Sequence, residues 1–278
     1  MNTAGHNWTL RMDRRVRFEG QLRMESALHV GSGQGASHTD ATVLRHADGR
    51  PFIPGSSLKG ALRSHLERLA QAPALGAEGV SSCLLYPDKQ EESTAPDCPT
   101  PGWVDAKKDA TEATEEQFEA LCHTCTLFGS PILAGKVRVL DLDVVERTYG
   151  GGVEVRDGVG IDRDRGKAVD GVKFDYEVVP GDTAFRFSLA AENPDPVELG
   201  LLAAGVREMQ RGQVAVGGKT TRGLGACVLE GLSVYHADLS DPVKLSEYLT
   251  SRGEGTGVSE VDDPDAFLDE CIDHLFGG

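Results

Sequence analysis

The sequence has none of the long apolar segments that mark membrane proteins. No run approaches the roughly 18 consecutive apolar residues of a membrane-spanning helix. The first residues, which include His6 and Arg11, contain neither an apolar signal core nor a small-residue cleavage site. Six cysteines in 278 residues are too few for a disulfide scaffold. These absences argue against secretion and membrane insertion, so we expect a protein of the reducing cytoplasm with no membrane partner.

The sequence also lacks an excess of positive charge. It has 28 basic and 44 acidic residues, a formal net charge of −16, which by itself argues against nucleic-acid binding. The acidity is confined to two segments, because residues 86–119 hold 10 acidic and 3 basic residues and residues 236–278 hold 11 and 2. The remainder has 23 residues of each sign, so a basic face for RNA is compatible with this composition.

Apolar periodicity predicts the order strand, helix, strand, strand, helix, strand. The strands are expected at 14–30, 136–146, 183–191 and 223–235, and the helices begin near 54 and 196. We expect an α+β protein with the ferredoxin-like or modified RNA-recognition-motif fold, in which an antiparallel sheet carries two helices on one face. Ser56 or Ser57 is a natural N-cap for the first helix.

Two stretches interrupt this pattern and are expected to be insertions. Residues 71–128 are rich in Pro, Glu, Asp and Ser, and residues 149–181 are Gly-rich and charged, as in a long protruding hairpin or loop. We therefore predict one domain over 1–235 that carries both insertions. The acidic tail, 236–278, is weakly amphipathic and is expected to form a short helix or to stay partly disordered.

Four cysteines in the first insertion predict a structural zinc site. Cys122 and Cys125 form a C-x₂-C pair, which places two thiolates on one side of a tight turn. Cys83 and Cys98 would complete a four-thiolate site, with His123 as a substitute ligand. The segment is polar and has little to bury, so a metal would supply the folding free energy that it lacks. The alternative is a set of free thiols in a disordered loop.

The glycine-rich stretch 217–225 contains Lys219, Thr220 and Arg222. A nucleotide-binding P-loop is excluded because the G-x₄-G-K-[ST] spacing fails and a helix precedes the loop. Glycines beside two cations nevertheless suit a backbone laid against a phosphate chain. The alternative is a plain turn into the last strand.

Ser56 and Lys59 match the S-x-x-K signature of serine acylases, but the partner motifs of that class are missing. A helix start that offers backbone N–H groups, the Ser56 and Ser57 hydroxyls, Lys59 and Arg63 to a phosphate is the simpler interpretation. Asp40 follows a Gly-rich stretch, and a carboxylate in such a loop is usually only solvated. By the same reasoning, the charged residues 162–165 form a hairpin tip.

Four motifs in this order together resemble the RAMP superfamily of CRISPR proteins. They are the hPGSSLKGxhR-like stretch 51–63, the LFGS stretch 127–130, the IDRxTG-like stretch 158–166 and the glycine-rich stretch 218–225. The resemblance runs from about residue 14 to residue 235. It is closest to the repeated backbone subunit of type III effector complexes.

The resemblance implies a subunit that polymerises along a guide crRNA, next to copies of itself, other RAMP subunits and further effector-complex subunits. It also implies a thumb-like hairpin that kinks the guide–target duplex, and a structural zinc, which many members hold. By resemblance, Asp40 matches the aspartate that cuts target RNA at each kink. The matched guide-binding positions are Ser56, Ser57, Lys59, Arg63, Lys219, Thr220 and Arg222, and the thumb region contains Ile161, Arg163 and Arg165.

The resemblance leads to a mechanistic hypothesis. A kink would align a target 2′-hydroxyl with its own phosphorus, and such alignment supplies much of the rate in intramolecular reactions. Asp40 would act as general base or hold Mg²⁺ or another divalent cation, so the products would be a 2′,3′-cyclic phosphate and a 5′-hydroxyl. The alternatives are a non-cutting RNA-binding and assembly subunit and, remotely, a serine acyl-hydrolase that uses Ser56 and Lys59.

Overall fold

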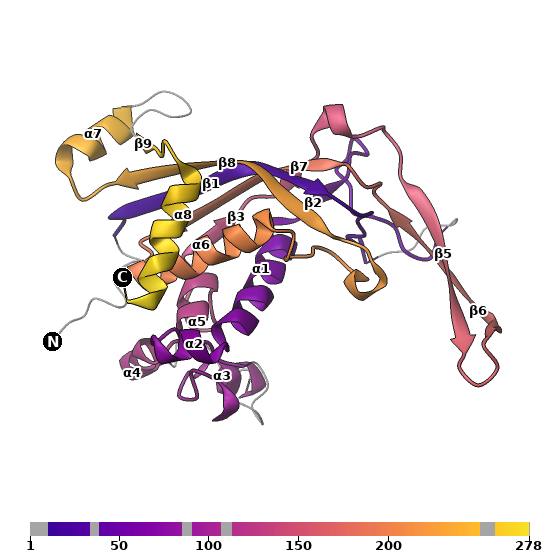
Figure 1. Ribbon diagram of the computed structural model, residues 1–278, viewed down its shortest axis with the longest axis horizontal. Coiled ribbons are helices and arrows are strands. Elements are labelled where there is room, and N and C mark those ends of the chain that lie inside the picture. The colour runs from indigo at the N-terminus through magenta and orange to yellow at the C-terminus, as the bar shows by residue number, and fades with distance from the viewer. Residues whose placement is uncertain (1–10, 34–38, 85–90, 107–112, 251–258, 278) are drawn as a thin grey trace.

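The strand β1 (Arg14–Met24) lies at the centre of a five-stranded antiparallel sheet of order β3-β7-β1-β8-β9 (Figure 1). The structure is a computed structural model, which describes residues 11–33, 39–84, 91–106, 113–250 and 259–277. The other strands of this sheet are β3 (Val137–Val139), β7 (Ala184–Glu192), β8 (Cys227–Asp238) and β9 (Ser259–Glu260). The α+β class predicted from the sequence is confirmed.

Helices cover one face of this sheet, and the described residues leave most of the other face open (Figure 1). In α1 (Gly55–Ala70), the leucines Leu58, Leu62 and Leu66 recur every fourth residue and are fully buried in the core with β1 and β7. The helix α6 (Pro196–Gln210) begins with a capping box between Asp195 and Glu198, which satisfies two backbone donors at its first turn. These local signals explain why the sequence pattern predicts both helices.

The predicted strand over 14–30 is too long. β1 ends at Met24, because beyond this residue the chain leaves the sheet and Leu28 pairs instead with Val179. The predicted strand over 136–146 is divided into β3 and β4 (Leu142–Asp143), and β4 pairs with β2 (Phe52–Ile53) in a separate two-stranded sheet.

The prediction of a serine N-cap for α1 is wrong. Pro54 occupies the N-cap position, and Ser56 and Ser57 lie in the first helical turn. The helix starts early because Gly55 packs directly on β3: a Cβ atom at Gly55 would lie 2.2 Å from the Val139 carbonyl oxygen. The Gly55 N–H donates instead to the Asp141 carboxylate at 2.8 Å.

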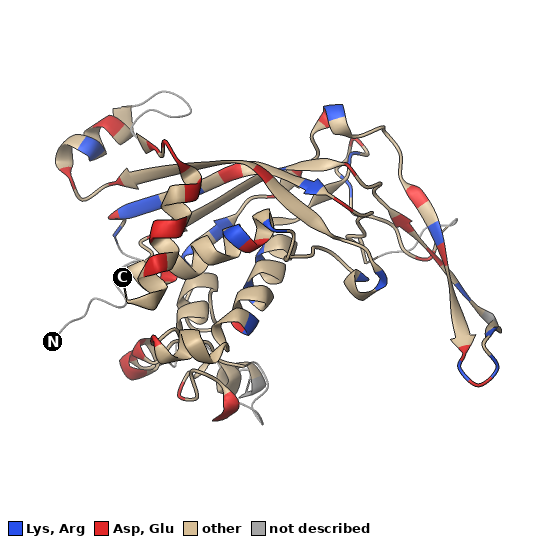
Figure 2. Cartoon of the chain, viewed as in Figure 1, with Lys and Arg blue, Asp and Glu red and all other residues tan. Residues whose placement is uncertain are grey.

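The first insertion is a small helical unit with an apolar core of its own. Its helices are α2 (Pro73–Ala77), α3 (Thr100–Ala106), α4 (Glu115–Glu119) and α5 (His123–Phe128). Trp103, Leu121 and Ile132 are buried around the four cysteines. The expectation that this segment has little to bury is therefore wrong, although its outer surface carries the predicted acidic residues, as α4 shows in Figure 2.

The second insertion is a long hairpin of β5 (Glu154–Asp162) and β6 (Lys167–Val178) that projects from the sheet (Figure 1). The aromatic ring of Phe174 covers Gly158 on the facing strand, where a Cβ atom would lie 2.3 Å from the ring. Several apolar side chains of the hairpin are exposed, among them Val159 and Ile161.

The described part of the tail forms regular secondary structure. It contains α7 (Pro242–Thr250), β9 and α8 (Pro264–Asp273).

α8 docks on α6 through Leu268 and Cys271, and Leu275 of the 3₁₀ turn that follows α8 also packs there; all three are buried. The close approach depends on Gly200 of α6, where a Cβ atom would lie 2.5 Å from the Cys271 carbonyl oxygen. The outward surface of α8 is acidic (Figure 2). None of the helices in the described residues is both long and apolar enough to cross a membrane.

Candidate nucleic-acid interface and metal centre

The Asp40 loop is attached to the base of the hairpin. The Asp40 N–H donates to the Asp175 carboxylate at 2.8 Å, and the Asp175 N–H donates to the Asp40 carboxylate at 3.0 Å. The Glu177 N–H donates to the Ala41 carbonyl oxygen at 2.9 Å. Asp40 is therefore an exposed carboxylate in a fixed position, rather than one in a free loop.

Glu177 of β6 anchors the chain that follows Asp40. Its carboxylate is only 5% exposed and accepts hydrogen bonds from the Val43 N–H at 3.0 Å and from Arg45 at 2.7 Å. A buried carboxylate needs such partners, because an unpaired charge is costly to remove from water. The segment after Asp40 is thus tied to β6 at several points.

The glycine-rich loop lies against the same end of β6. The Lys219 ammonium lies 4.6 Å from the centroid of the Tyr176 ring, and the Arg222 guanidinium lies 5.6 Å from that of Phe174. Cation–π contacts of this length hold cations over a ring face. Thr220 lies between them, in the 3₁₀ turn Thr220–Arg222. The structure therefore attaches Asp40, Lys219 and Arg222 to the same short stretch of β6, residues 174–176, although they are far apart in the sequence.

His29 connects these segments and was not among the predicted site residues. Its Nδ1 atom lies 2.7 Å from the Glu177 carbonyl oxygen, and its ring packs edge-on against Tyr176 at 5.6 Å. The His29 carbonyl oxygen accepts the Gly218 N–H at 2.8 Å. Gly217 has a φ of +87°, and a Cβ atom there would lie 2.6 Å from the same oxygen. A single histidine in an apolar stretch gives no sequence signal for this role.

The start of α1 presents a different set of groups. Ser56 is exposed and Ser57 half-buried, while the Lys59 ammonium donates to the Val137 carbonyl oxygen at 2.7 Å. Burial, and then the charge of Arg63, lowers the pKa of Lys59. Among the described residues, Lys59 makes no hydrogen bond to Ser56, so the geometry of an S-x-x-K acylase is not present.

The contacts of Arg63 and of the hairpin tip lie elsewhere than at the hairpin base, where Asp40 is held. The Arg63 guanidinium turns toward α5 and donates to the Gly129 carbonyl oxygen at 2.7 Å. Ile161, Arg163 and Arg165 are exposed at the tip of the hairpin, far from its base in Figure 1. Within one subunit, the structure does not bring these residues together with Asp40.

The four cysteines form one compact group. Their sulfur atoms all lie within 4.8 Å of one another, with Cys83 and Cys98 at 3.6 and 4.0 Å from Cys125. A tetrahedral zinc ion with Zn–S bonds of about 2.3 Å needs sulfur atoms about 3.8 Å apart, so the group fits zinc. His123 is turned away, because its Nδ1 atom accepts the Ser81 N–H at 3.0 Å. The group that could hold a metal ion is therefore the four thiols, without His123.

The thiols of this group influence one another strongly. A hydrogen bond with Cys125 lowers the pKa of Cys122 to about 7, whereas a hydrogen bond with Cys122 raises the pKa of Cys83. Four buried thiolates would repel one another, so a cation would be needed to hold all four in the ionised form.

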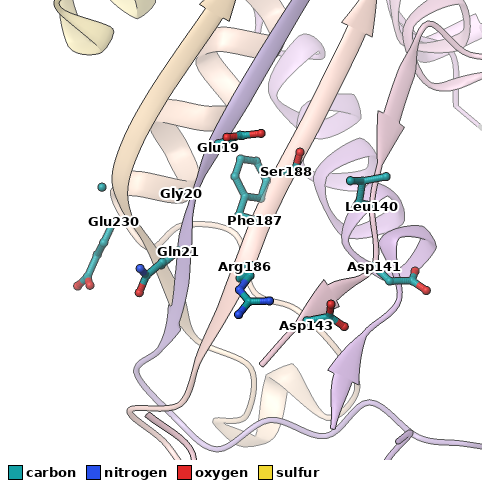
Figure 3. Close-up of a pocket in the computed structure, with 11 residues that line it drawn as sticks. Glu19, Gly20, Gln21, Leu140, Asp141, Asp143, Arg186, Phe187, Ser188 and Glu230 are labelled. Atoms are coloured by element: carbon teal, nitrogen blue, oxygen red, sulfur yellow. The ribbon is translucent and has the colours of Figure 1, made fainter. Parts of the chain in front are cut away.

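The open face of the sheet carries a shallow hollow of about 630 Å³ (Figure 3). The carboxylates of Glu19, Asp141, Asp143 and Glu230 line it, with Arg186 between them. None of the predicted site residues lies in this hollow. Four carboxylates against one arginine make this hollow a poor site for a phosphate group.

Two comparisons with known proteins agree with these observations. The model of the RAMP superfamily matches residues 21–228. The CRISPR system Cms endoribonuclease Csm3 of Methanocaldococcus jannaschii is 44% identical over 57 residues, which are 19% of this chain and 23% of that relative. The match thus spans less than a quarter of the relative. Because the family model covers most of the chain, including the first helix and the glycine-rich loop, this protein belongs to the RAMP superfamily.

Proposed function

We propose that this protein is a guide-crRNA-binding backbone subunit of a type III CRISPR effector complex, and that it cleaves complementary target RNA. Membership of the RAMP superfamily and the short similarity to the endoribonuclease Csm3 support the class. The observation that carries the proposal is the attachment of Asp40, Lys219 and Arg222 to consecutive residues of β6 at the base of the hairpin. A carboxylate and two cations beside a projecting arm suit the cutting of a bound RNA strand.

The fold supports the same class. The order β3-β7-β1-β8, with α1 and α6 on one face, is the order of a ferredoxin-like or modified RNA-recognition-motif sheet. In this proposal, one domain covers residues 1–235 and carries insertions at 71–128 and 149–181. Residues 236–278 form the tail. The first insertion holds a structural zinc ion, and its ligands are Cys83, Cys98, Cys122 and Cys125.

The guide lies along the glycine-rich loop and the start of α1. Lys219 and Arg222 neutralise guide phosphates, and Thr220, Ser56 and Ser57 donate hydrogen bonds to phosphate oxygens. Lys59 keeps two ammonium hydrogens beyond its bond to Val137, so it contributes charge at the same site. The Asp141 carboxylate already accepts the first N–H of α1, so this helix start offers a phosphate fewer backbone donors than the sequence predicted.

The chemistry depends on alignment. Ile161, Arg163 and Arg165 at the hairpin tip act on the duplex held by neighbouring copies, where the arm would separate bases and kink the target strand. Asp40 would take the proton of an aligned target 2′-hydroxyl, whose oxygen bonds to its own phosphorus while the bond from phosphorus to the 5′-oxygen breaks, and that oxygen takes a proton from water. Alternatively, Asp40 and Asp175 would hold Mg²⁺ or another divalent cation, which would supply charge stabilisation at the phosphate. The Asp175 N–H keeps the Asp40 carboxylate oriented toward the bound strand.

The test is cleavage of a labelled complementary RNA by the assembled guide complex, with and without Mg²⁺. Asp40→Asn is the informative variant, because its amide oxygen still accepts the Asp175 N–H while the charge is lost. Asp182→Asn is the matched control, since the Asp182 side chain is 93% exposed. We expect regularly spaced cuts in wild type and control and none in Asp40→Asn, with guide binding intact in all three.

The same experiment separates the rival functions. Cutting by Asp40→Asn at the wild-type rate would remove Asp40 from the mechanism. The absence of cuts in a guide-bound wild-type complex would instead identify a non-cutting assembly subunit of the same fold. The serine acyl-hydrolase alternative has lost its support, because Lys59 is engaged by Val137 rather than by Ser56.

A further inference from the structure

Arg63 is placed by the RAMP-like motif on the guide-binding helix, but its side chain faces the cysteine group. All three guanidinium nitrogens have partners within the protein. Nε donates to Glu67 at 2.7 Å, Nη1 donates to the Gly129 carbonyl oxygen at 2.7 Å, and Nη2 lies 3.6 Å from the Cys125 sulfur. The side chain is 22% exposed. This geometry fixes Arg63 to α5 and leaves little of it for a phosphate.

The contacts of Arg63 hold the helix that carries two of the thiols. Cys122 is the N-cap of α5, and Cys125 lies in the helix. Gly129 ends α5 with a φ of +100°, and its N–H donates to the Cys125 carbonyl oxygen at 2.9 Å. Arg63 therefore binds both the sulfur of one ligand and the carbonyl group at the end of the same helix, so it fixes where that sulfur lies.

The charge of the cysteine group explains why a cation is needed there. Four thiolates and one Zn²⁺ carry a net charge of −2, and all four cysteines are buried. The other polar groups near the sulfur atoms are neutral: the Cys83 N–H and the Thr124 hydroxyl at Cys122, and the Thr100 hydroxyl at Cys98. Within the described residues, Arg63 is the cation whose hydrogen bond reaches one of these sulfur atoms.

We propose that Arg63 is a positioning residue of the metal centre, which compensates the charge of the zinc–thiolate group and joins it to α1, rather than a residue that binds guide phosphate. This inference depends on the zinc site of the proposed function. On this inference, the metal centre stabilises the position of α1, the helix that carries Ser56, Ser57 and Lys59. Loss of zinc would then weaken guide binding indirectly, with Arg63 as the connection.

The test measures zinc release and guide binding in the full-length protein. Arg63→Met removes the charge and keeps much of the volume, and Arg63→Lys keeps the charge but loses the fork that reaches two partners. Arg68→Met, at an exposed position of the same helix, is the matched control. Zinc release to a chromophoric chelator gives the affinity, and the sulfur-to-metal charge-transfer band of the Co²⁺-substituted protein reports on the thiolates.

We expect Arg63→Met to bind zinc roughly 10- to 100-fold more weakly, as is usual when a group that orients metal ligands is removed. Arg63→Lys should lie between it and wild type, with a shifted Co²⁺ band, and Arg68→Met should match wild type. At saturating zinc, all variants should bind guide RNA with the wild-type salt dependence. Circular dichroism at saturating zinc checks that each variant is folded.

Two results would overturn the inference, and they differ from failure of the zinc site itself. Arg63→Met with wild-type zinc affinity and a shallower salt dependence of guide binding would make Arg63 a phosphate ligand. Variants with wild-type zinc affinity and an unshifted Co²⁺ band would leave Arg63 without a role at the metal. A wild-type protein that binds neither Zn²⁺ nor Co²⁺ would remove the zinc site, and this inference with it.

Discussion

Asp40 and Asp175 hold each other in place, because each donates its backbone N–H to the other's carboxylate, at 2.8 and 3.0 Å. One residue belongs to the loop that precedes α1 and the other to β6. The position of the proposed catalytic carboxylate is therefore set by the hairpin and not by its own loop.

Asp175→Ala should slow target cleavage by roughly 10- to 100-fold, because a reacting group displaced by about 1 Å loses rate on this scale. Guide and target binding should be unchanged. Asp175→Asn should recover much of the rate, since its amide oxygen still accepts the Asp40 N–H. Single-turnover cleavage by the assembled complex measures this effect. Equal rates for Asp175→Ala and wild type would show that the pairing does not orient Asp40.

Lys219→Gln with Arg222→Gln should weaken guide binding and make it less sensitive to salt. Each phosphate contact on a single strand contributes about 0.7 to the slope of log affinity against log salt, so the slope should fall by about 1.4. Titration of labelled guide RNA at several salt concentrations measures it. Arg211→Gln, an exposed cation at the end of α6, is the control and should leave the slope unchanged. An unaltered slope in the double variant would argue against phosphate contacts from this loop.

Gly200→Ala should destabilise the protein by about 1–3 kcal/mol, which is usual for overpacking, because its Cβ atom would meet the Cys271 carbonyl oxygen at 2.5 Å. Gly60→Ala is the matched control in α1, where a Cβ atom meets nothing within 4 Å. Alanine is the better helix former, so that variant should gain up to about 1 kcal/mol. Urea unfolding measures both free energies. Equal stabilities would mean that α8 does not depend on this close approach.

The docking of α8 should weaken in acid. Hydrogen bonds from Gln210 and then Arg207 lower the pKa of Asp265, so folding favours its ionised form. This contribution is fully present above the unfolded pKa of about 3.9 and is lost as the pH falls through the lower folded pKa. Amide exchange of α8, relative to α1, should therefore speed up as the pH falls below the unfolded pKa of the aspartate. Gln210→Ala together with Arg207→Met should remove most of this pH dependence, and a double variant that kept it would exclude these two hydrogen bonds to Asp265 as its cause.

Removal of zinc should loosen the first insertion and leave the sheet intact. Trp103 is 3% exposed and packs in the same cluster as the four cysteines. In a Trp8→Phe background, a chelator should therefore shift Trp103 emission to longer wavelength, as should Cys125→Ser. Circular dichroism should retain most of the signal of the sheet. Unchanged Trp103 emission after complete metal removal would show that the insertion folds without the ion.

The sequence predicts the elements well where the signal is local. The spacing of Leu58, Leu62 and Leu66 and the alternation of Phe185 and Phe187 depend only on neighbouring residues, so they mark α1 and β7 directly. The ends of strands were less predictable. The division of the 136–146 strand follows from Asp141, which turns toward a helix start 86 residues away.

In the candidate site too, the sequence predicts local groupings of residues but not contacts between distant segments. The C-x₂-C spacing of Cys122 and Cys125 points to the four-cysteine group, because such a pair is typical of metal-binding sites. The partnership of Asp40 with Asp175 joins residues 135 positions apart, and no pattern in the sequence connects them. His29 and Glu177 are ordinary residues whose roles come only from burial. Arg63 shares a helix face with Lys59, yet the tertiary fold turns it to the cysteine group.

The hairpin has a mechanical consequence. β6 is one continuous strand from Lys167, beside the tip, to Val178, and it contains Asp175 and Glu177 near its inner end. The arm is therefore connected to the Asp40 loop through one strand, which the loop meets by hydrogen bonds at Asp175, although the pairing of β6 with β5 shifts register between Val159 and Ile161. An adjacent subunit or a paired duplex that contacts the tip could bend the hairpin. Because β6 continues to Asp175, such bending would displace Asp40 at the base. Cleavage in such an assembly would respond to strain in the filament as well as to the sequence of its target.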